Sequence, residues 1–258
     1  MKRLLRMTAV SAALLCAFVI GKPAQARRTA AAPLPGVVTC GGIEATIVGT
    51  EGDDVIQGTD GHDVIVGLGG NDVIRAGDGE DRVCGGPGND LIEGQGDEDV
   101  LLGEEGDDHL DGGEGGCCNF ATNTGDDVLS GGPGNDVLHS SDFPQAGNTL
   151  YGDQGEDKIY LWAAGMAIGA KGYAYGGNGD DEIYQYTGDA MLEGGNGSDL
   201  IVDWNDGGLN DETIVMLGMN GDDELRSEDF TSTVEMDGGR GADTCVAGDS
   251  TSNCEGGD

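Results

Sequence analysis

An aspartate recurs every nine residues through a long stretch of the chain, at Asp54, Asp63, Asp72, Asp81, Asp90, Asp99 and Asp108. Carboxylate oxygens at a fixed repeat suit a hard divalent cation, because calcium takes about six to eight oxygen ligands in loose geometry. Magnesium fits less well because it demands tighter octahedral geometry, and zinc and iron prefer nitrogen and sulfur ligands. The chemistry that these residues indicate is therefore calcium binding.

Aspartates in the same local pattern continue beyond Leu110, where the nine-residue spacing is interrupted and then resumes in segments such as GGPGNDVL and GGNGDDEI. They are Asp127, Asp136, Asp157, Asp181, Asp199, Asp223 and Asp243. Degenerate turns between them, near Leu150, Ile168 and Leu192, keep an apolar residue but lose the aspartate. We predict that both sets of aspartates bind several calcium ions.

Each nine-residue unit also has a structural pattern around its aspartate. Glycine occupies the fourth position of the units between Gly49 and Asp111, with Asp97 as the exception. An aliphatic residue occupies the eighth position, at Ile56, Ile65, Ile74, Val83, Ile92, Leu101 and Leu110. Glycine, aspartate and asparagine favour turns, whereas Val-Ile pairs favour strands. Each unit therefore predicts a turn followed by a strand of about three residues.

This pattern, GGxGxDxUx with U a large apolar residue, resembles the hemolysin-type calcium-binding repeat (RTX) family. The resemblance is best over residues 49–110 and extends, more weakly, to about residue 245. It implies an all-β fold: a right-handed parallel β-roll, or β-solenoid, in which two repeats form one coil. Residues eighteen apart then stack, with Asp54, Asp72, Asp90 and Asp108 on one edge and Asp63, Asp81 and Asp99 on the other.

Such columns of carboxylates would repel one another without a cation. Two carboxylates about 5 Å apart cost about 1 kcal/mol in water and several times more in a partly buried site. A dication between them reverses the sign of the interaction. We therefore expect the chain to be largely disordered in chelator and to gain β structure with calcium.

The composition agrees with a chain that depends on cations. The formal net charge is -37, from 49 acidic and 12 basic residues, and aromatic residues make up 5% of the chain. So few large apolar residues leave two possibilities: a disordered chain, or one whose carboxylates are neutralised on folding. The strong negative charge argues against nucleic acid as a partner, because phosphates would be repelled.

The first 26 residues have the pattern of a secretory signal peptide. Lys2, Arg3 and Arg6 precede a mostly apolar run from Met7 to Ile20, and the small residues of Ala24-Gln25-Ala26 suit cleavage. The apolar run is short for a membrane span, so we predict no membrane span. Residues 27–39, rich in Ala and Pro, predict a disordered lead-in. The expected location is secreted, or extracellular.

Six cysteines remain after the signal peptide, and an even number in an exported chain suggests disulfides. We prefer the pairs Cys40–Cys84 and Cys245–Cys254, the latter closing a short loop. Cys117 and Cys118 are adjacent, and would form a strained vicinal bond or pair elsewhere. Free thiols are the alternative reading.

The predicted organisation after the lead-in has three parts. A regular roll covers 40–111, a loop insertion covers 112–124, and residues 125–258 continue the roll with degenerate repeats and a disulfide-closed C-terminal cap. Almost nothing remains outside the repeats to form a separate catalytic domain.

Three functions follow from these observations. The first is a secreted calcium-binding structural or binding module that folds on calcium and has no catalytic residues. The second is a calcium-dependent adhesin or glycan-binding protein with a cell-surface or extracellular ligand, because aromatic residues gather within 151–204 and exposed aromatic rows often bind partners. The alternative reading is that these aromatics cap or widen the interior of the roll. The third, an enzyme or toxin, lacks support because neither an HExxH nor a GxSxG motif is present.

Overall fold

The computed structural model describes residues 36–113, 126–140, 147–162, 171–186, 188–204, 213–228 and 233–247. All of them belong to one compact unit, Pro33–Asp258. Every regular element in these ranges is a β-strand, which confirms the all-β prediction. Within the same ranges, no helix has the length and apolar character needed to cross a bilayer. The predicted signal peptide, most of the lead-in and residues 114–124 of the predicted insertion lie outside the described residues.

Two ten-stranded sheets contain almost all of the strands, and their neighbouring strands are parallel. Sheet I consists of β4 (Val55–Gln57), β6 (Val73–Asp78), β8 (Leu91–Gly96), β10 (His109–Asp111), β12 (Val137–His139), β14 (Lys158–Leu161), β16 (Glu182–Gln185), β18 (Leu200–Asp203), β20 (Glu224–Ser227) and β22 (Thr244–Ala247). Sheet II consists of β3 (Ile47–Val48), β5 (Val64–Val66), β7 (Arg82–Cys84), β9 (Val100–Leu102), β11 (Val128–Pro133), β13 (Thr149–Gln154), β15 (Lys171–Asn178), β17 (Asp189–Asn196), β19 (Thr213–Asn220) and β21 (Thr233–Asp237).

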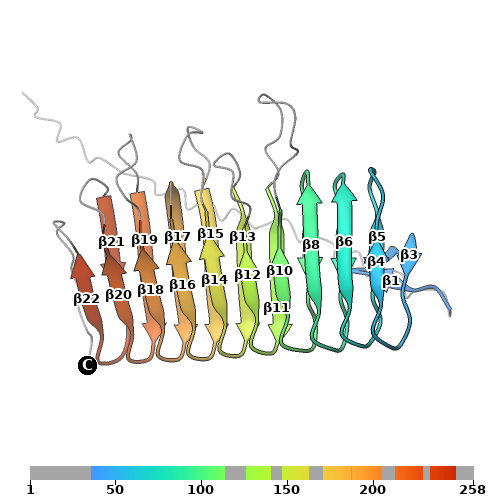
Figure 1. The fold of residues 1–258 in the computed structure, drawn as a ribbon. Coiled ribbons are helices and arrows are strands. Elements are labelled where there is room, and N and C mark those ends of the chain that lie inside the picture. The colour runs from blue at the N-terminus through green and yellow to red at the C-terminus, as the bar shows by residue number, and fades with distance from the viewer. Residues whose placement is uncertain are drawn as a thin grey trace, which may run out of the picture. The chain divides into compact units, whose positions relative to one another are not determined.

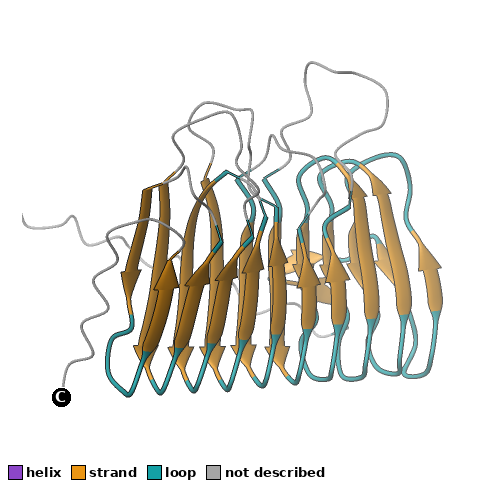
Figure 2. Cartoon of the chain, turned by 60° about the vertical axis from the view of Figure 1, so that its left-hand side comes forward, coloured by secondary structure: helices purple, strands orange, loops and turns teal. Residues whose placement is uncertain are grey.

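The chain passes alternately between the two sheets, so each coil contributes one strand to each of them (Figure 1). This is the stacking of a β-solenoid. We call the turns that lead from sheet II into sheet I the first edge, and the connections that lead from sheet I into sheet II the second edge. The turns of the first edge form one row along the lower side of the stack in Figure 2. The two edges are the places where the repeat aspartates lie.

The interior between the sheets is a double row of aliphatic side chains. Sheet I contributes Ile56, Ile74, Ile92, Leu110, Leu138, Ile159, Ile183, Ile201 and Leu225. Sheet II contributes Ile65, Val83, Leu101, Leu129, Leu150, Ala174, Leu192, Met216 and Met236. These are the eighth-position residues, and the predicted stacking of residues eighteen apart is confirmed between β4 and β10. The alternation of a strand turns every second side chain inward, which explains why one aliphatic residue per repeat suffices.

Strand lengths change along the stack. The predicted three-residue strand is found in β4, β5, β7, β9, β10 and β12. Sheet II strands lengthen to six residues in β11 and β13 and to eight in β15, β17 and β19. The later coils therefore hold more backbone hydrogen bonds between neighbouring strands than the early ones.

After the first coil, glycine is required at the fourth repeat position because successive turns of the first edge touch one another. Gly106 has φ 146°, and a Cβ built on it would lie 1.8 Å from the carbonyl oxygen of Gly88. The Gly106 N–H also donates to the carbonyl of Pro133, at 2.9 Å, in the following coil. On the second edge the exception, Asp97, adopts φ 72°, a conformation that aspartate tolerates better than most residues.

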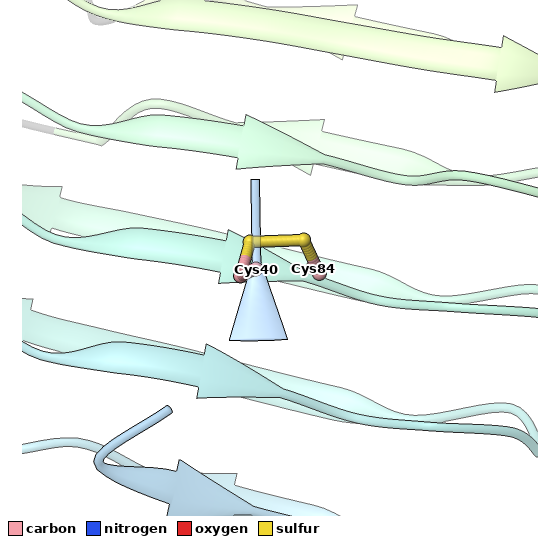
Figure 3. Close-up of a disulfide and its surroundings, with 2 residues drawn as sticks. All are labelled: Cys40 and Cys84. Atoms are coloured by element: carbon pink, nitrogen blue, oxygen red, sulfur yellow. A yellow bond between two sulfur atoms is a disulfide. The ribbon is translucent and has the colours of Figure 1, made fainter. Parts of the chain in front are cut away.

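A short antiparallel hairpin lies outside the two large sheets. Its strands are β1 (Thr39–Cys40) and β2 (Ile43–Glu44), so β1 begins one residue inside the predicted lead-in. Cys40 forms a disulfide with Cys84 of β7, with the two Cα atoms 5.6 Å apart (Figure 3), which confirms the preferred pairing. The disulfide belongs to a second small core with the buried Val66. The hairpin is thereby fixed to the outer face of sheet II.

The C-terminal cysteine pairing is described only in part. Cys245 of β22 is disulfide-bonded and packs against the main core. Its predicted partner Cys254, like Cys117 and Cys118, lies outside the described residues.

The close stacking of turns predicts that Gly106→Ala destabilises the roll. The new Cβ combines an unfavourable φ with a backbone overlap, so we expect the free energy of unfolding to fall by roughly 2–4 kcal/mol. The matched control is Gly52→Ala, at the same repeat position in the first coil, where a Cβ would meet nothing within 4 Å. Denaturant unfolding in excess calcium measures both, and equal unfolding midpoints for the two variants would contradict the stacking argument.

Candidate calcium-binding edges

The first edge presents one aspartate per coil. The column runs through Asp54, Asp72, Asp90, Asp108, Asp136, Asp157, Asp181, Asp199, Asp223 and Asp243. Each directly precedes a strand of sheet I, where the tight turn ends and the extended chain begins. Six of the seven aspartates predicted beyond Leu110 therefore lie on this one edge.

Hydrogen bonds join each aspartate of the column to the next. The backbone N–H of Asp90 donates to Oδ1 of Asp108 at 2.8 Å, and the N–H of Asp108 donates to Oδ1 of Asp136 at 2.7 Å. The same bond recurs from Asp54 to Asp243 without interruption. One oxygen of every carboxylate except the first is therefore used to hold the neighbouring coil.

The other carboxylate oxygen, Oδ2, is buried in most coils and has no hydrogen-bond partner. Such atoms occur in Asp72, Asp81, Asp90, Asp99, Asp108, Asp136, Asp157, Asp181, Asp199, Asp223 and Asp243. A buried oxygen without a partner is costly, and an unpaired buried charge costs more. A regular row of such atoms indicates a cation that the protein is built to receive.

The glycine that opens most repeats creates the space around these oxygens. A Cβ on Gly85 would lie 2.3 Å from Oδ2 of Asp90 and 2.9 Å from the carbonyl oxygen of Gly103 in the next coil. On Gly176 it would lie 2.4 Å from Oδ2 of Asp181 and 2.5 Å from the carbonyl oxygen of Gly194. A carboxylate oxygen and a backbone carbonyl therefore converge where the glycine has no side chain.

This donor set consists of oxygens alone. Among the described residues, no group of three His, Cys, Asp or Glu side chains is placed to hold a metal ion. An ion at an edge must therefore take much of its coordination from backbone carbonyls, with one or two carboxylates from adjacent coils. Calcium accepts such mixed oxygen ligands in loose geometry, so the aspartate ladder fits calcium.

The second edge carries the same ladder over a shorter length. Asp63, Asp81, Asp99 and Asp127 are joined by N–H to Oδ1 bonds of 2.8 to 3.0 Å. The ladder continues from the N–H of Asp127 to Oδ1 of Asn148, at 2.9 Å. Beyond Asn148 the same register position holds Gly172, Ala190, Ile214 and Val234. The two edges are therefore unlike in the second half of the roll.

The first coil also departs from the pattern. Oδ2 of Asp54 accepts hydrogen bonds from the N–H of Thr50, at 2.6 Å, and from its hydroxyl, at 2.8 Å. Oδ2 of Asp63 accepts the equivalent pair from Thr59. These two predicted ligands already have donors, unlike the aspartates that follow them.

From the sequence spacing, only the aspartates up to Asp108 could be assigned to an edge. Between successive coils of the first edge the separation is 18 residues up to Asp108, and then varies between 18 and 28. Asn148 was not predicted as part of a ladder. The signal that could have found it is its place one residue before a Thr-Leu strand, where the other repeats have aspartate.

In the metal-free protein, burial raises the pKa of most of the ladder aspartates. It raises the pKa of Asp99 to about 8, with the charges of Asp127 and Asp81 adding to the effect. The pKa is about 7 for Asp108, Asp127, Asp157 and Asp199, and about 6 for Asp81, Asp90, Asp136 and Asp181, with burial as the largest cause. Burial also acts on Asp63, but hydrogen bonds from Thr59 and Thr46 lower its pKa overall.

The aromatic residues between Tyr151 and Trp204 lie on the outer faces of the sheets. In β14 the side chains of Ile159 and Leu161 are buried, whereas Tyr160 between them is turned outward. Stacked ring pairs connect neighbouring coils, with centroids 4.4 Å apart for His139–Tyr160, 5.3 Å for Tyr160–Tyr184, 4.3 Å for Trp162–Tyr186 and 5.0 Å for Tyr151–Tyr175. The reading in which aromatics widen the interior is wrong, because aliphatic residues occupy the inward positions.

The geometry defines a class of protein: a parallel β-roll of glycine- and aspartate-rich turns, with unpaired carboxylate oxygens along its edges. The family model of the RTX calcium-binding nonapeptide repeat matches residues 48–83, 57–92, 85–116, 119–142 and 146–163. Residues 48–163 therefore carry calcium-binding nonapeptide repeats of the kind that this family model describes. A search of curated proteins found no match.

The raised pKa values predict how the metal-free chain responds to pH. A carboxyl group that titrates near 4 when unfolded and near 6 to 8 when folded retains its proton only in the roll at intermediate pH. The stability that these groups contribute is therefore full below pH 4 and is lost as the pH rises through about 6 to 8. Far-UV circular dichroism in metal-free buffer should show more β structure at pH 5 than at pH 8. Greater β content at pH 8 would contradict the sign of this linkage.

Proposed function

We propose that this protein is a secreted, extracellular structural module that folds on calcium. The observation that carries the proposal is the row of buried Oδ2 atoms without hydrogen-bond partners along both edges. The match to calcium-binding repeats supports the identity of the ion. The acidic composition supports a dependence on cations, because net charge of -37 opposes compaction.

In this proposal, Oδ2 of each ladder aspartate from Asp72 onward binds an ion together with glycine carbonyls of the adjacent coil. Oδ1 meanwhile retains its hydrogen bond to the preceding coil, so the same side chain positions the turn and binds the metal. Several ions are needed, because each position along an edge serves only neighbouring coils. The two rows are defined by Asp81, Asp99 and Asp127 on the second edge and by the column from Asp72 to Asp243 on the first edge.

Secretion completes the proposal and explains when folding takes place. The signal-like residues 1–26 would direct export, and cytoplasmic calcium is too scarce to fill sites of extracellular affinity, roughly 0.1–1 mM. The chain would then be exported unfolded and would fold outside the cell. The buried disulfide Cys40–Cys84 is consistent with an oxidising compartment.

Folding coupled to calcium is directly testable on the mature chain at pH 8. We expect little β signal in chelator, and a cooperative gain of β structure as calcium rises through roughly 0.1–1 mM. Magnesium at the same concentrations should give a smaller response, because it retains its waters and demands tighter geometry. An ordered spectrum in excess chelator at this pH would contradict the proposal.

Two adjacent aspartates offer a matched pair for assigning the ligands. Asp108 is buried in the ladder, whereas Asp107 beside it is exposed and accepts the N–H of Asn135 at 2.9 Å. Asp108→Asn removes a candidate ligand charge, so we expect the calcium midpoint of folding to rise roughly fivefold to tenfold. Asp107→Asn makes the same change of net charge and should leave the midpoint within about twofold. Equal effects of the two variants would assign the response to total charge instead of to a site.

A second candidate function, calcium-dependent glycan binding, is favoured by a recess on the outer face of sheet II. Tyr175 stacks on Tyr151 through one ring face, while its register neighbour on the other side is Glu193. A recess of about 170 Å³ is lined by Tyr175, Glu193, Asn196 and Asn220. An aromatic ring beside a carboxylate and amide groups can hold a small polar ligand with an apolar face, such as one sugar residue.

Glycan-array binding with and without calcium tests this candidate. We expect Tyr175→Ala to abolish glycan binding. Tyr184→Ala, which removes an outward ring on sheet I, should leave it unchanged. Loss of glycan binding in both variants would contradict a sugar site at this recess. Absence of glycan binding by the unmodified protein would contradict it as well.

A further inference from the structure

A set of buried polar side chains lies inside the second edge, in the part where the aspartate ladder has ended. Gln185, Asp203 and Ser227 are the last residues of β16, β18 and β20, and they are direct register partners in sheet I. Their side chains therefore stand one above the other, about 4.8 Å apart per coil. None of them belongs to a glycine- and aspartate-rich turn of the repeat type.

All three residues are withdrawn from water. Gln185 and Asp203 have no exposed surface, and Ser227 is 3% exposed. The Ser227 hydroxyl donates to Oδ2 of Asp203 at 2.8 Å. The side-chain amide of Gln185 donates from Nε2 to the carbonyl of Gly188 at 3.0 Å. Burial and these bonds fix the orientation of the set.

One oxygen of this set has no hydrogen-bond partner. Oε1 of Gln185 is buried and accepts nothing, while its register neighbour is the carboxylate of Asp203. A buried acceptor without a donor is unfavourable unless a positive charge or a proton lies near it. The residues at the former aspartate position of this edge, Ala190 and Ile214, are apolar and bring no positive charge.

We propose that Gln185, Asp203 and Ser227 form a separate calcium site inside the second edge. An amide oxygen, a carboxylate and a hydroxyl are hard oxygen ligands of the kind that calcium takes in proteins. This site differs from the turn sites of the second edge in where its side chains lie along the chain. They come from the ends of sheet I strands, before the chain crosses to sheet II, whereas the ladder aspartates of this edge lie after the crossing. An ion bound there would connect the coils of β16, β18 and β20 on the second edge, where the aspartate ladder has ended.

The two tryptophans provide a local probe for this site. Trp204 directly follows Asp203, and Trp162 lies in register with Tyr186, the residue after Gln185. Terbium replaces calcium at oxygen sites and emits when a nearby tryptophan transfers energy to it, an effect that falls steeply with distance. In the Trp162→Phe variant the only remaining tryptophan is Trp204, which is roughly 14 Å or more from the ladder aspartates of either edge.

We expect saturable, Trp204-sensitised terbium emission from the folded Trp162→Phe protein. Adding Asp203→Asn should weaken terbium binding at this site about tenfold, because affinity depends on ligand charge. Gln185→Met, which removes Oε1 at similar volume, should also weaken it. The matched control Asp107→Asn makes the same change of charge at an exposed position outside the ladder and should leave the Trp204 signal unchanged.

Two results would overturn the proposal. One is the absence of Trp204-sensitised emission. The other is equal emission before and after Asp203→Asn in protein that circular dichroism shows to be folded. If Asp203→Asn does not fold, Ser227→Ala replaces it and should reduce emission. Circular dichroism reports the folding of the turns and Trp204-sensitised emission reports this site, so the two proposals can fail separately.

Discussion

Electrostatic repulsion along the edges is the constraint on which this structure depends. A parallel solenoid repeats every coil at about 4.8 Å, so any charged residue in the repeat becomes a column of like charges. Here the repeated residue is a buried aspartate, and burial raises its pKa because the ionised form has lost its water. The roll can hold these aspartates only as protonated groups or as ligands of a cation. At neutral pH and in calcium-rich surroundings, the second state is favoured.

The two oxygens of each carboxylate have different roles in joining the coils. Oδ1 accepts the N–H of the preceding aspartate, which fixes the turn in place. Oδ2 faces the space left by the first glycine of the repeat, where a carbonyl of the next coil also points. From the second coil on, the fourth-position glycines allow this spacing because a Cβ, as at Gly88 or Gly106, would overlap the adjacent turn. The repeat therefore uses glycine and aspartate together, because the glycine leaves the space in which the aspartate Oδ2 lies.

The roll uses different means of joining its coils in its two halves. The first edge keeps its aspartate ladder from Asp54 to Asp243, whereas the second edge ends its ladder at Asn148. In the later coils the strands of sheet II lengthen and outward rings stack between coils, as in Tyr160–Tyr184. Cross-strand pairs of this kind each contribute up to about 1 kcal/mol. Apolar residues such as Ile214 occupy the vacated positions, so the later half relies less on ions along that edge.

The sequence alone determined the repeat, the all-β solenoid and the ladder aspartates up to Asp108, because strict spacing leaves one way to stack identical units. It favoured the Cys40–Cys84 pairing without determining it, and the structure confirmed that pairing. The sequence did not determine on which edge the later aspartates lie. Insertions of varying length separate the later strands, so residues that stack are no longer eighteen apart in the sequence. Only the tertiary structure showed that these insertions fall on the second edge, which leaves Asp136 and its successors together on the first. Only the packed coils, likewise, bring Gln185, Asp203 and Ser227 into one buried column, because their register depends on pairing between strands far apart in the chain.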